Sequence, residues 1–165
     1  TEIIRALYAA SQTGVKIRLN VRGICCLQPG IPELSENIMV TSIVDRFLEH
    51  SRIMYFHNGG DAQVYISSAD WMSRNLDRRV ELLVPVEDRA CRERLVQILD
   101  VCFRDNVKAC VLGSEGRYER RKASSPGRAV RGQEVLYRQA RTAAQSAKQD
   151  SRATFEPQRP AETPP

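Results

Sequence analysis

The sequence predicts an α/β domain, because helix-type and strand-type patterns of apolar residues alternate along residues 1–113. Residues 3–8 carry apolar side chains at helical spacing, and residues 15–21 then alternate strictly between apolar and polar. A second helical stripe spans residues 89–103, behind Asp88, which can cap the helix. Short β-branched segments lie between these two helices, so we expect a sheet flanked by helices.

The first predicted helix ends at Gly14, and the strand at 15–21 carries valine, isoleucine and leucine on one face. Arg22 continues the polar face of this strand and stands beside Gly23, which lets another group approach closely. The connection over 23–37 contains two prolines and is long for a plain loop, which favours a functional role.

Further strands are predicted at 38–44, 53–56, 64–67, 79–86 and 107–111. The run Asn58-Gly59-Gly60-Asp61 is typical of the tight turn of a β-hairpin. The stripe expected to be buried in the helix 89–103 consists of Cys91, Leu95, Ile98, Leu99 and Cys102.

The C-terminal third differs in composition, and we expect the compact domain to be residues 1–113. Residues 114–130 resemble a linker, residues 131–149 a helix with a weak apolar face, and residues 150–165 a disordered tail with four prolines. Residues 1–113 carry 14 basic and 14 acidic side chains, whereas residues 114–165 carry 11 and 6, so the basic charge belongs to the tail. A solvated extension or a handle for polyanions would both fit this charge.

The chain begins with Thr1, inside a helical pattern, so we expect it to be the C-terminal piece of a larger protein. Its five cysteines lack metal-ligand spacing, and reduced cysteines are typical of cytoplasmic proteins. We therefore expect a cytoplasmic location, with membrane association left open.

Residues 47–81 concentrate side chains that suit phosphate chemistry. His50 and Arg52 would share one face of an extended segment, where the imidazole could act as nucleophile or proton donor beside a cation. Glu49 and Asp70 could orient this imidazole, as acidic partners of catalytic histidines do. The other candidate members of the site are Ser68, Arg74, Asn75 and Arg79.

Part of this segment resembles the phospholipase D family, whose enzymes use a His-x-Lys motif followed by an Asp and a Gly-Ser-x-Asn step. His50-Ser51-Arg52 is similar to the first motif with Arg in place of Lys, and Ser67-Ser68-Ala69-Asp70 stands near the second. His57 falls where the aspartate of the motif would be counted. These departures favour a family that kept the phosphate cradle and changed the reaction.

Residues 1–112 resemble the C-terminal phospholipase D-like domain of polyphosphate kinase. The segments that carry the resemblance are Arg22-Gly23-Ile24-Cys25-Cys26-Leu27, Ser35-Glu36-Asn37-Ile38, Ser42-Ile43-Val44, Arg46-Phe47-Leu48-Glu49-His50-Ser51-Arg52, Asn58-Gly59-Gly60, Ser67-Ser68-Ala69-Asp70-Trp71-Met72 and Arg74-Asn75-Leu76-Asp77-Arg78-Arg79-Val80-Glu81. The resemblance implies a phospholipase D-like sheet flanked by helices, followed here by the basic tail.

The resemblance also implies a reaction, the reversible transfer of the γ-phosphate of ATP to polyphosphate with Mg²⁺. Arg22 and His50 match positions that bind ATP, and Arg52 and Arg79 are expected to add phosphate contacts. The phosphate-carrying histidine and the Mg²⁺ ligands are expected in the preceding domain, so no metal ligand is expected in this chain. His50 would then protonate or stabilise the departing ADP, or carry phosphate as a second histidine.

Implied partners are ATP, ADP and polyphosphate, together with the upstream domains and a second copy in a homo-oligomer; specific nucleic-acid binding is not expected. The sequence is also compatible with two other functions. A stand-alone phosphodiesterase would need the missing Lys of the His-x-Lys motif. A non-catalytic polyanion-binding module would use the basic tail.

Overall fold

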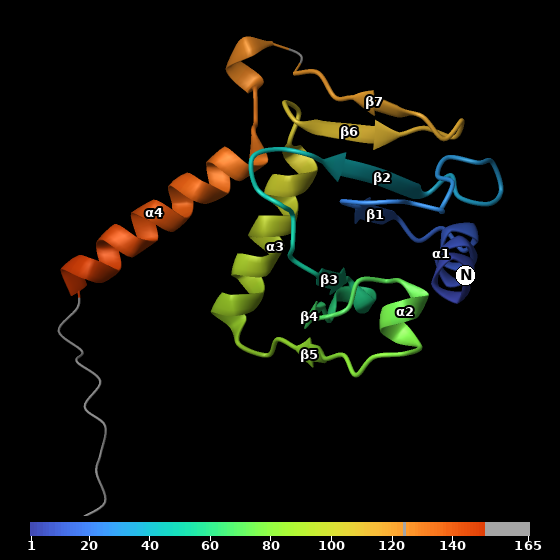
Figure 1. Cartoon of the computed structure of the whole chain (residues 1–165), viewed down its shortest axis with the longest axis horizontal. Coiled ribbons are helices and arrows are strands. Elements are labelled where there is room, and N and C mark those ends of the chain that lie inside the picture. Colours follow the sequence, from blue (N-terminus) through green and yellow to red (C-terminus); the bar gives the residue numbers. More distant parts are fainter. Residues whose placement is uncertain (124, 151–165) are drawn as a thin grey trace, which may run out of the picture.

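The computed structural model describes residues 1–123 and 125–150, and the tail expected to be disordered lies outside the described residues from 151 onward. These described residues form two sheets and four α-helices, which agrees with the predicted α/β class. The long helix α3 (Arg89–Arg104) contacts β1 of one sheet and β3 of the other, and lies between the two sheets in Figure 1.

The larger sheet has the strand order β1-β2-β6-β7. Its members are β1 (Ile17–Asn20), β2 (Ile38–Ile43), β6 (Ala109–Leu112) and β7 (Tyr118–Arg120). β1 and β2 are parallel, whereas the β2–β6 and β6–β7 pairs are antiparallel. The parallel pair places the ends of β1 and β2 at the same edge, where Arg22 follows β1.

The smaller sheet is an antiparallel meander of β3 (Ile53–Phe56), β4 (Gln63–Ser67) and β5 (Leu83–Pro85). A 3₁₀ turn at Asn58–Gly60 joins β3 to β4, with Gly59 and Gly60 at φ values of 63° and 108° that favour glycine. The hairpin prediction is therefore confirmed. The strand predicted over 79–86 is shorter, because the connection from α2 (Ser73–Leu76) continues through Leu82.

The core consists of two clusters on the larger sheet. In the first, Val40 and Leu112 pack with Leu27 and Ile38, and α1 (Glu2–Gln12) covers them with partly buried side chains. The second joins Ile43 of β2 to Cys102 and Ala109, with partly buried side chains from α3 and α4 (Gly132–Asp150) against it.

Cys91 is exposed, so the prediction that it belongs to the buried stripe of α3 is wrong. It lies in the first turn of the helix, where its backbone N–H donates to the capping carboxylate of Asp88 at 2.8 Å. The stripe becomes buried only towards the other end of the helix, where Val101, Cys102 and Phe103 meet the sheet.

The segment expected to be a linker contains β7, which extends the larger sheet by pairing with β6. Arg121, directly after β7, donates to the backbone carbonyl of Phe103 at 2.6 Å. α4 occupies the segment where a helix is predicted, and its first turns contact α3 before the helix extends away from the sheets (Figure 1). Strand β7 is only three residues long and has no buried side chain, so no apolar alternation marks it in the sequence.

Candidate functional site

Arg22 lies at the end of β1, and its guanidinium joins two distant segments. Its Nη1 donates to the backbone carbonyl of Glu49 at 2.7 Å, and its Nη2 lies 3.0 and 3.1 Å from the two carboxylate oxygens of Asp70. The backbone N–H of Val21 donates to Thr41 of β2 at 2.8 Å, which fixes the strand end from which Arg22 projects.

Arg52 binds the same carboxylate and also contacts the histidine. Its Nε donates to Oδ1 of Asp70 at 3.0 Å, while its Nη1 lies 3.2 Å from Nδ1 of His50. A guanidinium has donors only, so in this contact Nδ1 of the imidazole accepts. Asp70 thus stands between two arginines, one of which leads to His50.

The carboxyl group of Asp70 has a pKa below its usual range, chiefly because it accepts the hydrogen bond from Arg52 and also because it lies beside Arg22. At neutral pH the group of Arg22, Arg52 and Asp70 therefore carries a net positive charge. The two arginine side chains retain 27% and 20% of their surface, and His50 is exposed. A fixed, partly exposed pair of guanidinium forks beside an imidazole suits the binding of phosphate groups.

One detail differs from the predicted arrangement. His50 and Arg52 lie directly before β3, which begins at Ile53 as predicted, but the imidazole is not held by the expected carboxylates. Neither acidic residue touches the imidazole: Asp70 binds the arginines, and the carboxylate of Glu49 accepts from Nε2 of Gln133 at 2.7 Å. Arginine supplies more donors than imidazole, so the carboxylate of Asp70 pairs with the two arginines instead.

Ser68 and Asn75 support the site through the backbone. The hydroxyl of Ser68 accepts from the N–H of Leu82 at 2.9 Å and donates to the carboxylate of Glu81. Asn75 is buried, and its Nδ2 donates to the backbone carbonyl of Asp70 at 3.1 Å. Both residues therefore hold the loop that presents Asp70.

Arg74 and Arg79 are not brought to the arginine pair. Arg74 is exposed on the short helix α2. Arg79 lines a different hollow, an open cavity of about 290 Å³ that Trp71, Asn75 and Leu82 also border. Within the part of the chain that the structure describes, the site is thus formed by Arg22, His50, Arg52 and Asp70.

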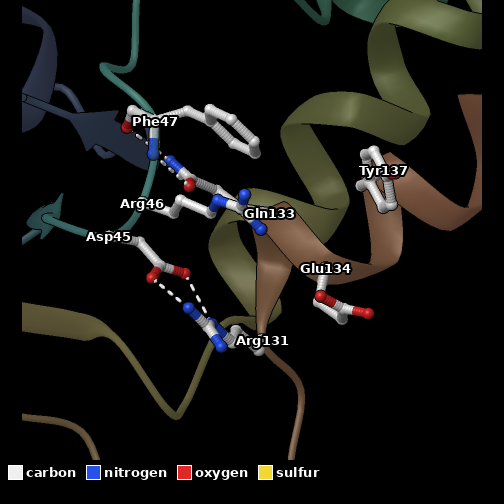
Figure 2. A pocket seen from close by; sticks show the side chains of 7 residues that line it. All are labelled: Asp45, Arg46, Phe47, Arg131, Gln133, Glu134 and Tyr137. Carbon is white, nitrogen blue, oxygen red and sulfur yellow. Dashed lines mark hydrogen bonds and ion pairs between the residues drawn. The ribbon is translucent and has the colours of Figure 1, made fainter.

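Sequence reasoning missed a second group of residues, which ties α4 to the segment before His50 (Figure 2). The carboxylate of Asp45, just after β2, accepts two hydrogen bonds from Arg131 at 2.6 and 2.8 Å. Gln133 binds the backbone of Phe47 through its side-chain amide. The cavity beside these residues has a volume of about 40 Å³, enough for a few waters and too small for a nucleotide.

Replacing Asp45 by Asn is expected to lower the unfolding free energy of the chain at pH 7 by about 1–3 kcal/mol. Its hydrogen bonds from Arg131 hold the pKa of Asp45 below the ordinary value of 3.8. A carboxyl group whose pKa is lower in the folded state stabilises above the unfolded value, and this contribution disappears as the pH falls through the folded value. The difference between wild type and D45N should therefore narrow below about pH 4.

Urea unfolding of both proteins between pH 3 and pH 7 measures this difference. The control is Asp61→Asn at the exposed hairpin turn, which should change the stability at neutral pH by less than about 0.5 kcal/mol. A gap between D45N and wild type that widens as the pH falls would show that the Asp45–Arg131 pair does not act as described.

Comparison with known proteins places this site in a family. The family profile described as polyphosphate kinase C-terminal domain 2 matches residues 1–133. The chain belongs to the polyphosphate kinase family. It is 56% identical over 160 residues to a polyphosphate kinase of Rhodopirellula baltica and 58% identical over 119 residues to one of Pseudomonas aeruginosa.

A solved structure supports the polyphosphate kinase assignment at the level of the fold. The crystal structure of polyphosphate kinase from Porphyromonas gingivalis superposes with a TM-score of 0.82 and 46% sequence identity, covering 88% of this chain and 22% of that one. The match covers 97% of this chain with the Rhodopirellula relative and 72% with the Pseudomonas relative. The chain spans only 19% and 17% of these two curated relatives, so it corresponds to a C-terminal part of such proteins.

Proposed function

We propose that this chain forms one side of the active site of a polyphosphate kinase, which transfers the γ-phosphate of ATP reversibly to inorganic polyphosphate. The observation that carries the proposal is the cluster in which Asp70 fixes Arg22 and Arg52 beside the exposed His50. The membership of the chain in the polyphosphate kinase family supports the choice of substrates.

Phosphoryl transfer depends mainly on positioning and on stabilising charge, and the cluster supplies both. Asp70 takes an Nη of Arg22 and the Nε of Arg52, which leaves other N–H groups of each fork to bind phosphate oxygens. Because the carboxylate holds the forks in place, little side-chain entropy is lost when phosphate binds.

His50 would act at the atom where the phosphate bond breaks. One role is to donate a proton to, or otherwise stabilise, the departing ADP oxygen; the other is to carry phosphate as a second histidine. The first histidine that carries phosphate would belong to the part of the protein upstream of this chain. In either role the imidazole would act beside the guanidinium of Arg52, whose Nη1 lies 3.2 Å from Nδ1 and 3.5 Å from Nε2.

The donor set here does not fit Mg²⁺. In residues 1–123 and 125–150 no group of three or more acidic, cysteine or histidine side chains is placed to hold a metal ion. Asp70 is already occupied by two arginines. Our proposal therefore assigns the Mg²⁺ ligands to other parts of the protein and routes no step through the metal here.

The smaller sheet supports the proposal that further domains of the same protein pack on this chain. Trp71, Val80, Leu82 and Leu83 expose between 46% and 99% of their surface around α2 and β5. Trp71 and the neighbouring Met72 are both exposed at the start of α2. Trp71, Leu82 and Leu83 border one open hollow, and exposed apolar side chains gathered in this way are typical of a contact surface, for which the upstream domains are the proposed occupant.

The same proposal includes self-association into a homo-oligomer, which the family resemblance implies. It also includes a cytoplasmic location, which the free cysteines of the described chain support. None of the described helices is long and apolar enough to cross a membrane.

The decisive experiment compares the complete protein with the 165-residue chain in an assay for ATP-dependent polyphosphate formation. The complete protein should form polyphosphate, and the chain alone should be inactive because it holds only one side of the site. Hydrolysis of bis-p-nitrophenyl phosphate by the chain would favour the phosphodiesterase alternative instead. Loss of polyphosphate binding after truncation at Gly113 would favour the polyanion-binding module, although Arg121 of that segment is engaged with Phe103.

A further inference from the structure

We propose that Gln133, in the first turn of α4, is a positioning residue that holds the loop Phe47–His50 so that His50 meets its substrate. The proposal rests on the function proposed above, since it assigns Gln133 an effect that acts through His50. Nothing in the pattern of the sequence links these residues, which are more than 80 positions apart.

The side-chain amide of Gln133 makes its hydrogen bonds to this loop. Its Oε1 accepts from the backbone N–H of Phe47 at 2.8 Å, and its Nε2 donates to the carbonyl of the same residue at 2.7 Å. The second N–H of Nε2 donates to the carboxylate of Glu49 at 2.7 Å. Figure 2 shows the amide facing the backbone of Phe47. Phe47 lies outside the strands, so Gln133 provides the hydrogen-bond partners for its backbone N–H and carbonyl that a neighbouring strand would provide in a sheet.

The loop Phe47–His50 depends on these hydrogen bonds, because its own side chains bury little surface. Phe47 and Leu48 are 52% and 76% exposed, and His50 is exposed as well. Gln133 itself is 9% exposed, so its hydrogen bonds form away from water, where they are strongest. The loop is therefore held mainly by polar contacts from α4.

The start of α4 is itself fixed by the two residues that precede Gln133. The N–H of Gly132 donates to the carboxyl group of Asp105 at 2.6 Å, and Arg131 binds Asp45 through two hydrogen bonds. A side chain at position 132 would fit only tightly, since a Cβ there would lie 3.2 Å from Oδ2 of Asp105. A rigid platform of this kind is what a positioning residue requires.

The loop also connects Gln133 to the phosphate site. Glu49 accepts from Gln133 through its carboxylate and from Arg22 through its backbone carbonyl at 2.7 Å. Arg22 continues to Asp70, and Asp70 to Arg52 and His50. One chain of hydrogen bonds therefore runs from α4 to both residues expected to bind ATP.

The test compares Gln133→Ala with a matched control in the complete protein. Gln139→Ala removes a glutamine from the same helix, whose amide oxygen accepts from Arg94 of α3 at 2.8 Å and does not touch the loop. We expect Q133A to lower kcat for ATP-dependent polyphosphate synthesis roughly tenfold and Q139A to leave it unchanged. Hydrogen exchange at the backbone N–H of Phe47 should become faster in Q133A only.

The double variant decides whether Gln133 acts through His50. In a His50→Ala background, Q133A should lower kcat little further, because the effects of two residues that act as a unit are not additive. An equal tenfold loss in both backgrounds would show a general structural role and overturn the proposal. Full activity of Q133A while H50A is impaired would also overturn it, whereas full activity of H50A would instead remove the proposed function.

Discussion

Replacing His50 by alanine in the complete polyphosphate kinase is expected to lower the turnover of ATP-dependent polyphosphate synthesis by roughly 10²–10⁴. The imidazole is exposed beside the guanidinium of Arg52, at 3.2 Å, and alanine would leave the arginines in place without a group that can transfer a proton or a phosphate. The loss should therefore fall on kcat, with a smaller change in the KM for ATP, because Arg22 and Arg52 still hold phosphate.

His57→Ala is the matched control for this prediction. His57 is also exposed, but it lies at the hairpin turn, where its Nδ1 is 3.5 Å from the hydroxyl of Tyr55, and none of its described contacts involves an arginine. Steady-state rates measured across ATP concentrations should show a large loss of kcat in H50A and none in H57A. Equal rates for H50A and wild type would show that His50 has no part in the reaction.

The secondary structure could be predicted largely from local patterns. Alternation marked β1, and helical spacing with Asp88 as cap marked α3, because both patterns lie within one element. β7 was missed because this edge strand has three residues and no buried side chain, and it is defined by its pairing with β6, six residues away at Leu112↔Tyr118. An exposed strand that buries neither face leaves no such local pattern.

The site shows the same division between local and distant information. His50 and Arg52 are close in sequence, and their proximity was predicted, as was the importance of Arg22 at the end of its strand. The pairing of Asp70 with two arginines was not predicted. These arginines are 48 and 18 positions away, and the sequence does not show that the carboxylate binds them and not the imidazole. Gln133 gave no signal at all, because a single glutamine in a polar helix is ordinary.

Replacing Asp105 by alanine is expected to lower the unfolding free energy of the chain by about 3–5 kcal/mol. The side chain is completely buried, and its Oδ1 accepts from the N–H groups of Val107, Lys108 and Ala109 at 2.7 to 3.0 Å. Its Oδ2 accepts from Gly132 at 2.6 Å, so one carboxyl group joins the end of α3 and the start of β6 to the start of α4. Alanine would leave four backbone donors without an acceptor, at a cost of about 1–3 kcal/mol for a buried one.

Asp105→Asn separates the two halves of this contact. An amide oxygen can still accept from Val107, Lys108 and Ala109, but its NH₂ group would face the N–H of Gly132, where two donors meet. D105N should therefore lose roughly 1–3 kcal/mol, and hydrogen exchange should become faster at Gly132 while the other three N–H groups stay protected. Asp100→Ala, which removes an exposed carboxylate paired with Arg104 on the same helix, should change the stability by less than about 0.5 kcal/mol. Urea unfolding gives the free energies, and faster exchange at all four N–H groups in D105N would contradict the separate roles of the two oxygens.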